Sequence, residues 1–143
     1  GCHDLALAPA GVNALRSFLS RGGTLVIDNC QGLKTFDIAA RRELKKVLPQ
    51  SELKPIAPTH EIFSSYNKIS KVPYTPAVQR LNPKLNAPQL EGLNMDGGDL
   101  RVIYSPYGLG SGWQGDEHPQ GRDYAASDAL RLGVNIVTYA MTH

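Results

Sequence analysis

The sequence predicts an α/β fold in which helices cover both faces of a mostly parallel sheet. Residues 24–27 are a short, continuously apolar run between turn signals, which is typical of a strand buried on both faces. Amphipathic helical patterns lie on either side of this run, at residues 12–19 and 37–48. A second short strand is predicted at residues 53–56. Helix–strand–helix–strand order favours a doubly wound α/β sheet in a three-layer sandwich.

Turn and cap residues set the limits of the first elements. Pro9 opens the first helix, because the missing N–H of proline costs nothing in a first turn, and Gly22–Gly23 ends it. The second helix begins near residue 35 or 37 and stops before Pro49.

The middle of the chain is expected to be mostly irregular. Residues 57–90 are rich in Pro, Asn, Ser and Lys, with one short helical turn near Ile62. Residues 90–95 and 100–105, joined by the turn at 96–99, then predict a β-hairpin. Its second arm is the more apolar, so we expect it to be the more central strand.

A long C-terminal helix is predicted to begin near Asp123. Small and medium apolar residues form one stripe on it, which favours close packing on a sheet: Ala126, Ala129, Leu130, Gly133, Val137, Ala140 and Met141. Asn135 interrupts this apolar run. Because a buried amide must be hydrogen-bonded, we expect Asn135 to tie down a neighbouring loop.

Residues 1–143 are predicted to be a single α/β domain. Residues 1–4 stand directly before a helix and resemble the loop that follows a strand. A sheet of three or four strands is also small for two layers of helices. We therefore expect the domain to be a fragment that lacks an upstream strand.

Charge and hydropathy exclude two classes of function. The net charge is +2 and no segment concentrates basic residues on a stripe, so no nucleic-acid partner is predicted. No stretch of about 18 apolar residues occurs, so no membrane insertion by this segment is expected. The composition points to no particular cofactor.

Polar residues follow several predicted strands, where α/β sheets bind their ligands. Six of them are expected to meet at one edge and to form a pocket for a small polar ligand or a metal: His3, Asp28, Cys30, His60, Tyr107 and Trp113. The alternative is structural, with His3 and Asp28 only hydrogen-bonded to each other. Trp113 is more often packing than a ligand platform in such a place.

Cys30 is the candidate nucleophile, since it sits in a turn after a strand where N–H dipoles favour a thiolate. Its base would be His60 or His118. Two other interpretations stay open. Cys2, His3, Asp28, Cys30 and His60 are zinc ligands by type, though without CxxC or HxxxH spacing. Cys2 and Cys30 could also form a disulfide in an oxidising compartment.

The glycine loop at residues 110–115 matches the GxGxxG pattern formally. A dinucleotide site needs a helix to begin within that turn, with pyrophosphate at its N-terminus. Here residues 116–119 intervene, and Asp116 and Glu117 would repel phosphate. We therefore expect no dinucleotide binding.

Five segments together resemble the bacterial domain-of-unknown-function 4159 family. They are residues 1–3, 21–28, 60–63, 107–113 and 132–142. The resemblance implies a class I glutamine amidotransferase-like, flavodoxin-like fold, and an exported protein or one attached to a membrane-anchored parent. True members of that enzyme class carry Gly-x-Cys-x-Gly, whereas Asp28 replaces the first glycine here and no C-terminal His-x-Glu pair follows.

Because these amidotransferase motifs are incomplete, the sequence favours a non-catalytic module that binds a ligand or a protein partner. A Cys-dependent hydrolase or transferase centred on Cys30 is the alternative. Whether the protein is an enzyme is left open by the sequence.

Overall fold

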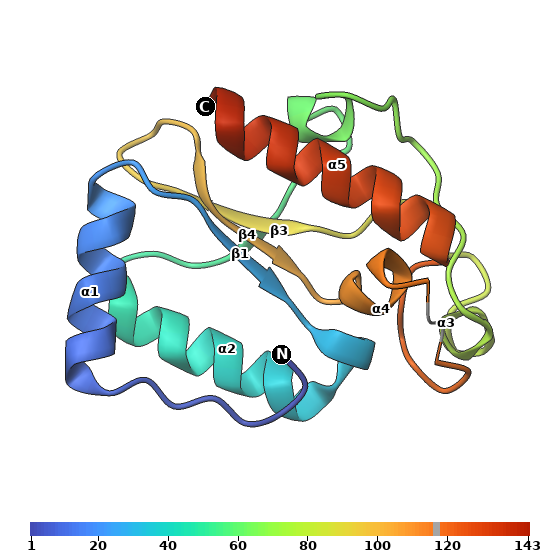
Figure 1. Cartoon of the computed structure of the whole chain (residues 1–143), viewed down its shortest axis with the longest axis horizontal. Coiled ribbons are helices and arrows are strands. Elements are labelled where there is room, and N and C mark those ends of the chain that lie inside the picture. The colour runs from blue at the N-terminus through green and yellow to red at the C-terminus, as the bar shows by residue number, and fades with distance from the viewer. Residues whose placement is uncertain (116–117) are drawn as a thin grey trace.

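A computed structural model describes residues 1–115 and 118–143. Its elements are, in chain order, α1 (Pro9–Ser20), β1 (Leu25–Asp28), η1 (Cys30–Gly32), α2 (Lys34–Val47), β2 (Lys54–Pro55), η2 (Glu61–Phe63), α3 (Pro76–Leu81), β3 (Glu91–Asn94), β4 (Leu100–Ser105), α4 (Gly110–Trp113) and α5 (Ala126–Thr142). Figure 1 shows α1 and α2 on one side of the sheet and α5 on the other.

The sheet has four strands in the order β1-β4-β3-β2. β1 and β4 are parallel, with Leu25 opposite Val102. β3 is antiparallel to both β4 and β2. The predicted mostly parallel, flavodoxin-like sandwich is therefore wrong, because only one of the three strand pairs is parallel.

The reason lies in the hairpin, whose prediction is confirmed. Asp96 and Gly97 adopt left-handed backbone angles, with φ of 55° and 72°, and return the chain directly beside β3. Two strands joined by such a tight turn must be antiparallel. Because these two strands occupy the centre of the sheet, the whole sheet is mixed.

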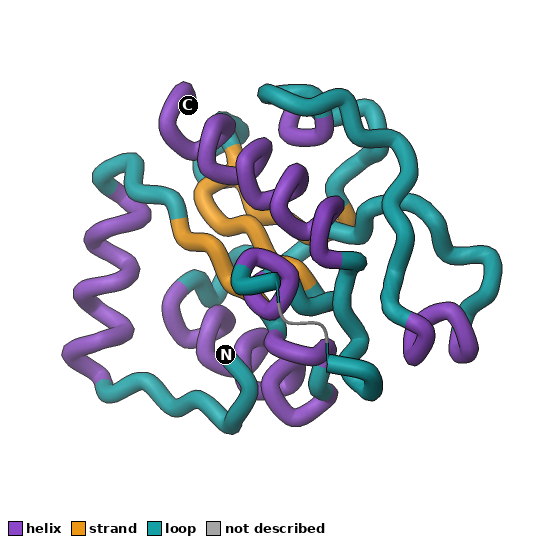
Figure 2. The backbone as a smooth tube through the Cα atoms, turned by 45° about the vertical axis from the view of Figure 1, so that its right-hand side comes forward, coloured by secondary structure: helices purple, strands orange, loops and turns teal. Residues whose placement is uncertain are grey.

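The two faces of the sheet bury separate apolar clusters. Toward α1 and α2, Leu19, Leu44 and Val47 pack on Val102 and Leu93. Toward α5, the core is larger and includes these fully or almost fully buried residues: Ile62, Leu90, Ile103, Leu109, Tyr124, Leu132 and Tyr139. Figure 2 shows the strands enclosed between the two groups of helices.

α5 begins at Ala126, three residues later than predicted. Within this helix, Asn135 anchors a neighbouring loop, as predicted. Its Oδ1 accepts the N–H groups of Tyr66 and Asn67, and its Nδ2 donates to the Asn67 carbonyl at 2.7 Å. Asn135 is fully buried, so these bonds fix the segment after η2 against the helix.

Three short helices were missed. η1 and α4 lie in stretches interpreted as loops, and α3 lies in the segment expected to be mostly irregular. α4 and α3 span only four and six residues, which is too short for a periodic apolar pattern to be recognised. None of the described helices is long and apolar enough to cross a membrane.

Candidate functional site

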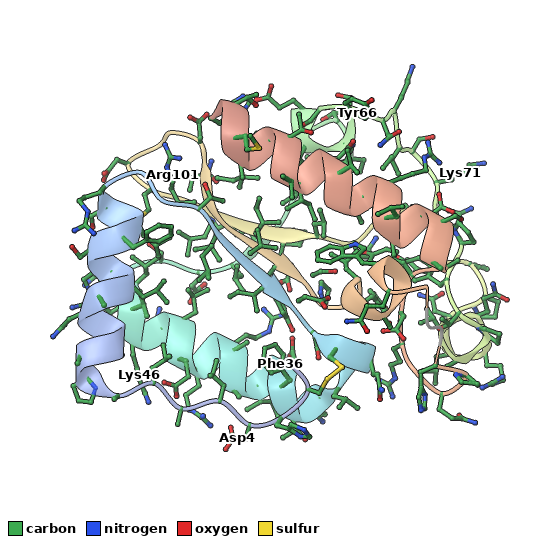
Figure 3. All side chains as sticks on the ribbon, viewed as in Figure 1. Asp4, Phe36, Lys46, Tyr66, Lys71 and Arg101 are labelled. Atoms are coloured by element: carbon green, nitrogen blue, oxygen red, sulfur yellow. A yellow bond between two sulfur atoms is a disulfide. The ribbon has the colours of Figure 1, made fainter. Side chains whose placement is uncertain are left out.

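Cys2 and Cys30 form a disulfide at the end of β1, so the interpretation of the two cysteines as a pair is confirmed. Their Cα atoms lie 4.8 Å apart, and the bond joins the first residues of the chain to η1 (Figure 3). The Cys30 sulfur is thereby occupied. In this oxidised form it is not a thiolate nucleophile.

Asp28 uses its carboxylate to hold α4. Oδ1 accepts the N–H of Leu109 at 2.8 Å, and Oδ2 accepts the N–H of Gly110 at 3.0 Å. These contacts satisfy donors at the start of a helix, which a carboxylate does well. Asp28 thus links the end of β1 to the glycine loop, rather than bonding to His3.

The two histidines proposed as bases lie in different places. The ring centre of His60 is 5.5 Å from that of Tyr139, whose hydroxyl accepts the N–H of Leu100 at the start of β4. β4 is six residues long, so this start is about 16 Å from the end where Cys30 lies. His118 is exposed and its Nδ1 accepts the N–H of Gln120.

His3 lies at the same end of the sheet as Cys30, and Trp113 is the last residue of α4, the helix that Asp28 holds. His3 is exposed next to the disulfide. The Trp113 indole donates from Nε1 to the Ala129 carbonyl at 2.8 Å and packs on Gly133, although 43% of the residue stays exposed. Among the described residues, no three His, Cys, Asp or Glu side chains gather as a set of metal ligands.

Tyr107 belongs to a cluster of three tyrosines at the end of β4. Its ring lies 5.0 Å from that of Tyr74 and 6.2 Å from that of Tyr124. The Tyr124 hydroxyl donates to the Gln89 carbonyl at 2.8 Å, and burial raises the pKa of Tyr124 to about 12. The cluster gives Tyr107 a rigid support.

A cleft of about 590 Å³ opens beside Tyr107, at the carboxyl end of β4. We call it the β4 cleft. Its lining residues come from α2, α3, the start of β3 and the loops around β4, and include Asn29, Lys34, Arg41, Asn82, Gln89, Glu91, Tyr107 and Arg122. Its volume and its mixed polar and apolar wall suit a small ligand.

The cations of the β4 cleft differ in their partners. Arg41 donates to Asp37 and Glu91, and the hydrogen bond to Glu91 raises the pKa of Arg41. Neither Lys34 nor Arg122 forms a side-chain ion pair or hydrogen bond within the described part of the chain. The cleft therefore contains two positive charges that no described side chain neutralises.

The backbone that positions Arg122 is unusual. Gln31 has φ 57° and ψ 14°, and Gly32 has φ 59°. The Arg122 N–H donates to the Gln31 carbonyl at 3.0 Å, and a Cβ on Gly32 would lie 2.6 Å from the Arg122 Cβ. A left-handed non-glycine residue is costly and is held by its surroundings, as is frequent at binding sites.

Asp123, next to Arg122, is a buried carboxylate with 1% of its surface exposed. Its oxygens form no hydrogen bond with a described residue, although the Ser111 hydroxyl and the Gln31 N–H lie close enough to favour the charged form. Burial raises the pKa of Asp123, and the nearby Asp28 carboxylate adds to that rise. Gly108 and Gly121 lie directly against the carboxyl group.

The structure thus brings His3, Asp28, Cys30 and Tyr107 to one end of the sheet and leaves His60 at the other. Sequence reasoning missed Lys34 and Arg122, the two cations of the β4 cleft that form no ion pair with a described residue. Lys34 is at the start of α2 and Arg122 is in a loop, and neither stands in a motif. Part of the glycine-loop argument concerned Asp116 and Glu117, which lie outside the described residues.

Comparison with known proteins adds one finding. No curated protein sequence matches the chain. One family model, described as a domain of unknown function (DUF4159), matches residues 1–141. This match spans the disulfide, the β4 cleft and all but the last residue of α5. The chain therefore belongs to the DUF4159 family.

Proposed function

We propose that this domain is a non-catalytic binding module that takes a small anionic ligand in the β4 cleft. The observation that carries the proposal is the pair of unneutralised cations, Lys34 and Arg122, in the wall of a 590 Å³ cleft. A guanidinium binds carboxylate or phosphate oxygens in a bidentate manner, and an ammonium adds a point charge. Tyr107 supplies an aromatic wall, and the side-chain amides of Asn82 and Gln89 supply donors and acceptors.

The position of the cleft also supports this proposal. Ligands of α/β proteins bind outside the carboxyl ends of strands, and the cleft lies outside the end of β4. The disulfide at the end of β1 favours an oxidising compartment, in agreement with an exported protein. We propose such a location for the domain.

Calorimetric titration tests the binding proposal with two defined anions, citrate and pyrophosphate. The wild type is expected to bind at least one of them. The double variant K34A/R122A should bind it about tenfold more weakly or worse, because charge-assisted hydrogen bonds are worth about 1.5–3 kcal/mol each.

The matched control is K68A/K71A, which removes the same charge from exposed lysines that do not line the cleft. Lys71 is labelled at the upper right of Figure 3, on the opposite side from α2. Unchanged affinity in this control supports the proposal. Failure of the wild type to bind either anion, or an equal loss in both double variants, contradicts it.

A further inference from the structure

Within residues 1–115 and 118–143, β1 pairs with β4 on one side, and on its outer edge it pairs only with Gly1. The Gly1 nitrogen donates to the Asp28 carbonyl at 2.5 Å, and the Cys30 N–H donates to the Gly1 carbonyl at 2.9 Å. These two bonds are the pattern that places one residue beside another, here Gly1 beside Asn29, in a parallel ladder. Figure 1 shows the N-terminus beside the end of β1.

The direction of each backbone N–H and C=O group of β1 follows from the alternation of residues along a strand. The Asn29 N–H donates to Ser105 on the β4 side, and the Cys30 N–H points to the opposite side. Successive residues of a strand alternate in direction, so Val26 and Asp28 present their N–H and C=O groups to the open edge. An open edge of this kind pairs readily with another strand.

Uncovered apolar surface lies on both faces next to the edge. On the face of α1 and α2, a cavity of about 190 Å³ is lined by Leu5, Leu7, Leu25 and Ile27, among others. On the face of α5, 38% of Val26 is exposed. An added strand would place alternate side chains on these two faces.

The flank of α5 on this side is also apolar, and among the described residues only Trp113 of α4 and residues of α5 itself line it. Its opposite flank carries Asn135, which holds residues 66 and 67. The apolar flank forms a groove of about 390 Å³ with α4, lined by Trp113, Leu130, Gly133, Val134, Val137 and Thr138. A contiguous apolar patch of this kind marks an interaction surface.

We propose that the edge of β1 receives an additional strand, which runs parallel to β1 and leads directly into Gly1. The residue two positions before Gly1 donates its N–H to the Val26 carbonyl and accepts the Asp28 N–H. Valine-like side chains of this strand fill the cavity lined by Leu5 and cover Val26. The disulfide of Cys2 then holds the end of the new strand against β1.

Hydrogen exchange measured by NMR tests the proposal on a chain lengthened at Gly1 by the six residues Val-Thr-Val-Ile-Val-Thr. We expect exchange of the Val26 and Asp28 amides to slow by at least about tenfold relative to the unextended chain. The matched control has proline at the second and fourth positions before Gly1, because proline cannot donate to a ladder. Its amides should exchange as in the unextended chain.

Two results would overturn the proposal. The first is unchanged exchange of both amides in the extended chain. The second is equal protection by the proline-containing extension.

Discussion

Glu43 of α2 and Asp123, beside the loop that follows β4, are both buried carboxylates, and their surroundings move their pKa values in opposite directions. Glu43 is 1% exposed and accepts hydrogen bonds from the Leu7 N–H at 3.0 Å, from Lys46 and from Arg42. The bond from Lys46 is the largest cause that lowers the pKa of Glu43 to about 2. Asp123 is equally buried, yet its pKa is raised.

The difference shows that the donors around a buried carboxylate decide the sign of its pKa shift, and burial alone does not. Glu43 fixes the N-terminal segment to α2 and is satisfied by those contacts. Asp123 is held between the glycines of the loops beside the β4 cleft. Carboxylates whose pKa is shifted by burial and by a neighbouring charge are found at binding and active sites more often than elsewhere.

The largest expected effect comes from crowding Asp123. A methyl group on Gly108 would overlap the Asp123 carboxylate and approach the Gln31 nitrogen at 3.0 Å. We expect G108A to lose about 3 kcal/mol or more of unfolding free energy in urea titration. G11A is the matched control, because nothing lies within 4 Å of its new methyl group in α1. Equal unfolding free energies of G108A and G11A would contradict this prediction, because the loop at Gly108 would then accommodate the methyl group without cost.

The next effect concerns the pH dependence that Glu43 confers. Its pKa is about 2 in the folded protein, against 4.5 for an ordinary glutamate. The free energy of unfolding that the ionised Glu43 contributes is fully present above pH 4.5. It is lost as the pH falls from 4.5 toward 2. E43Q should show a shallower decline of the urea midpoint over this range. Parallel curves for E43Q and the wild type would refute the assignment.

The smallest effect is expected for D123N. A raised folded-state pKa means that the protonated form suits the folded protein better, so stability falls as the pH rises above 3.8. The neutral amide should therefore be more stable than the wild type at pH 7, by about 1 kcal/mol. This advantage should disappear near pH 3, where Asp123 is protonated. A less stable D123N at both pH values would indicate that the charge has a partner.

Much of the local structure could be predicted from the sequence. Pro9 and Pro49 delimit the first two helices to within two residues, and the turn at Asp96 and Gly97 identifies the hairpin. Asn135 was identified as a loop anchor because a polar residue in an apolar run must find partners. These features depend on neighbours in sequence, where periodicity and turn chemistry act directly.

Tertiary structure alone decided the strand order and the composition of the candidate site. The hairpin arms lie at the centre of the sheet, which makes the sheet mixed. β2 runs in the same direction as β4, and the segment after β2 then carries His60 away from Cys30 to the ring of Tyr139. Lys34 and Arg122 meet in one cleft although they are far apart in the chain. No local pattern encodes such a meeting, because it results from the packing of whole helices and loops on the sheet.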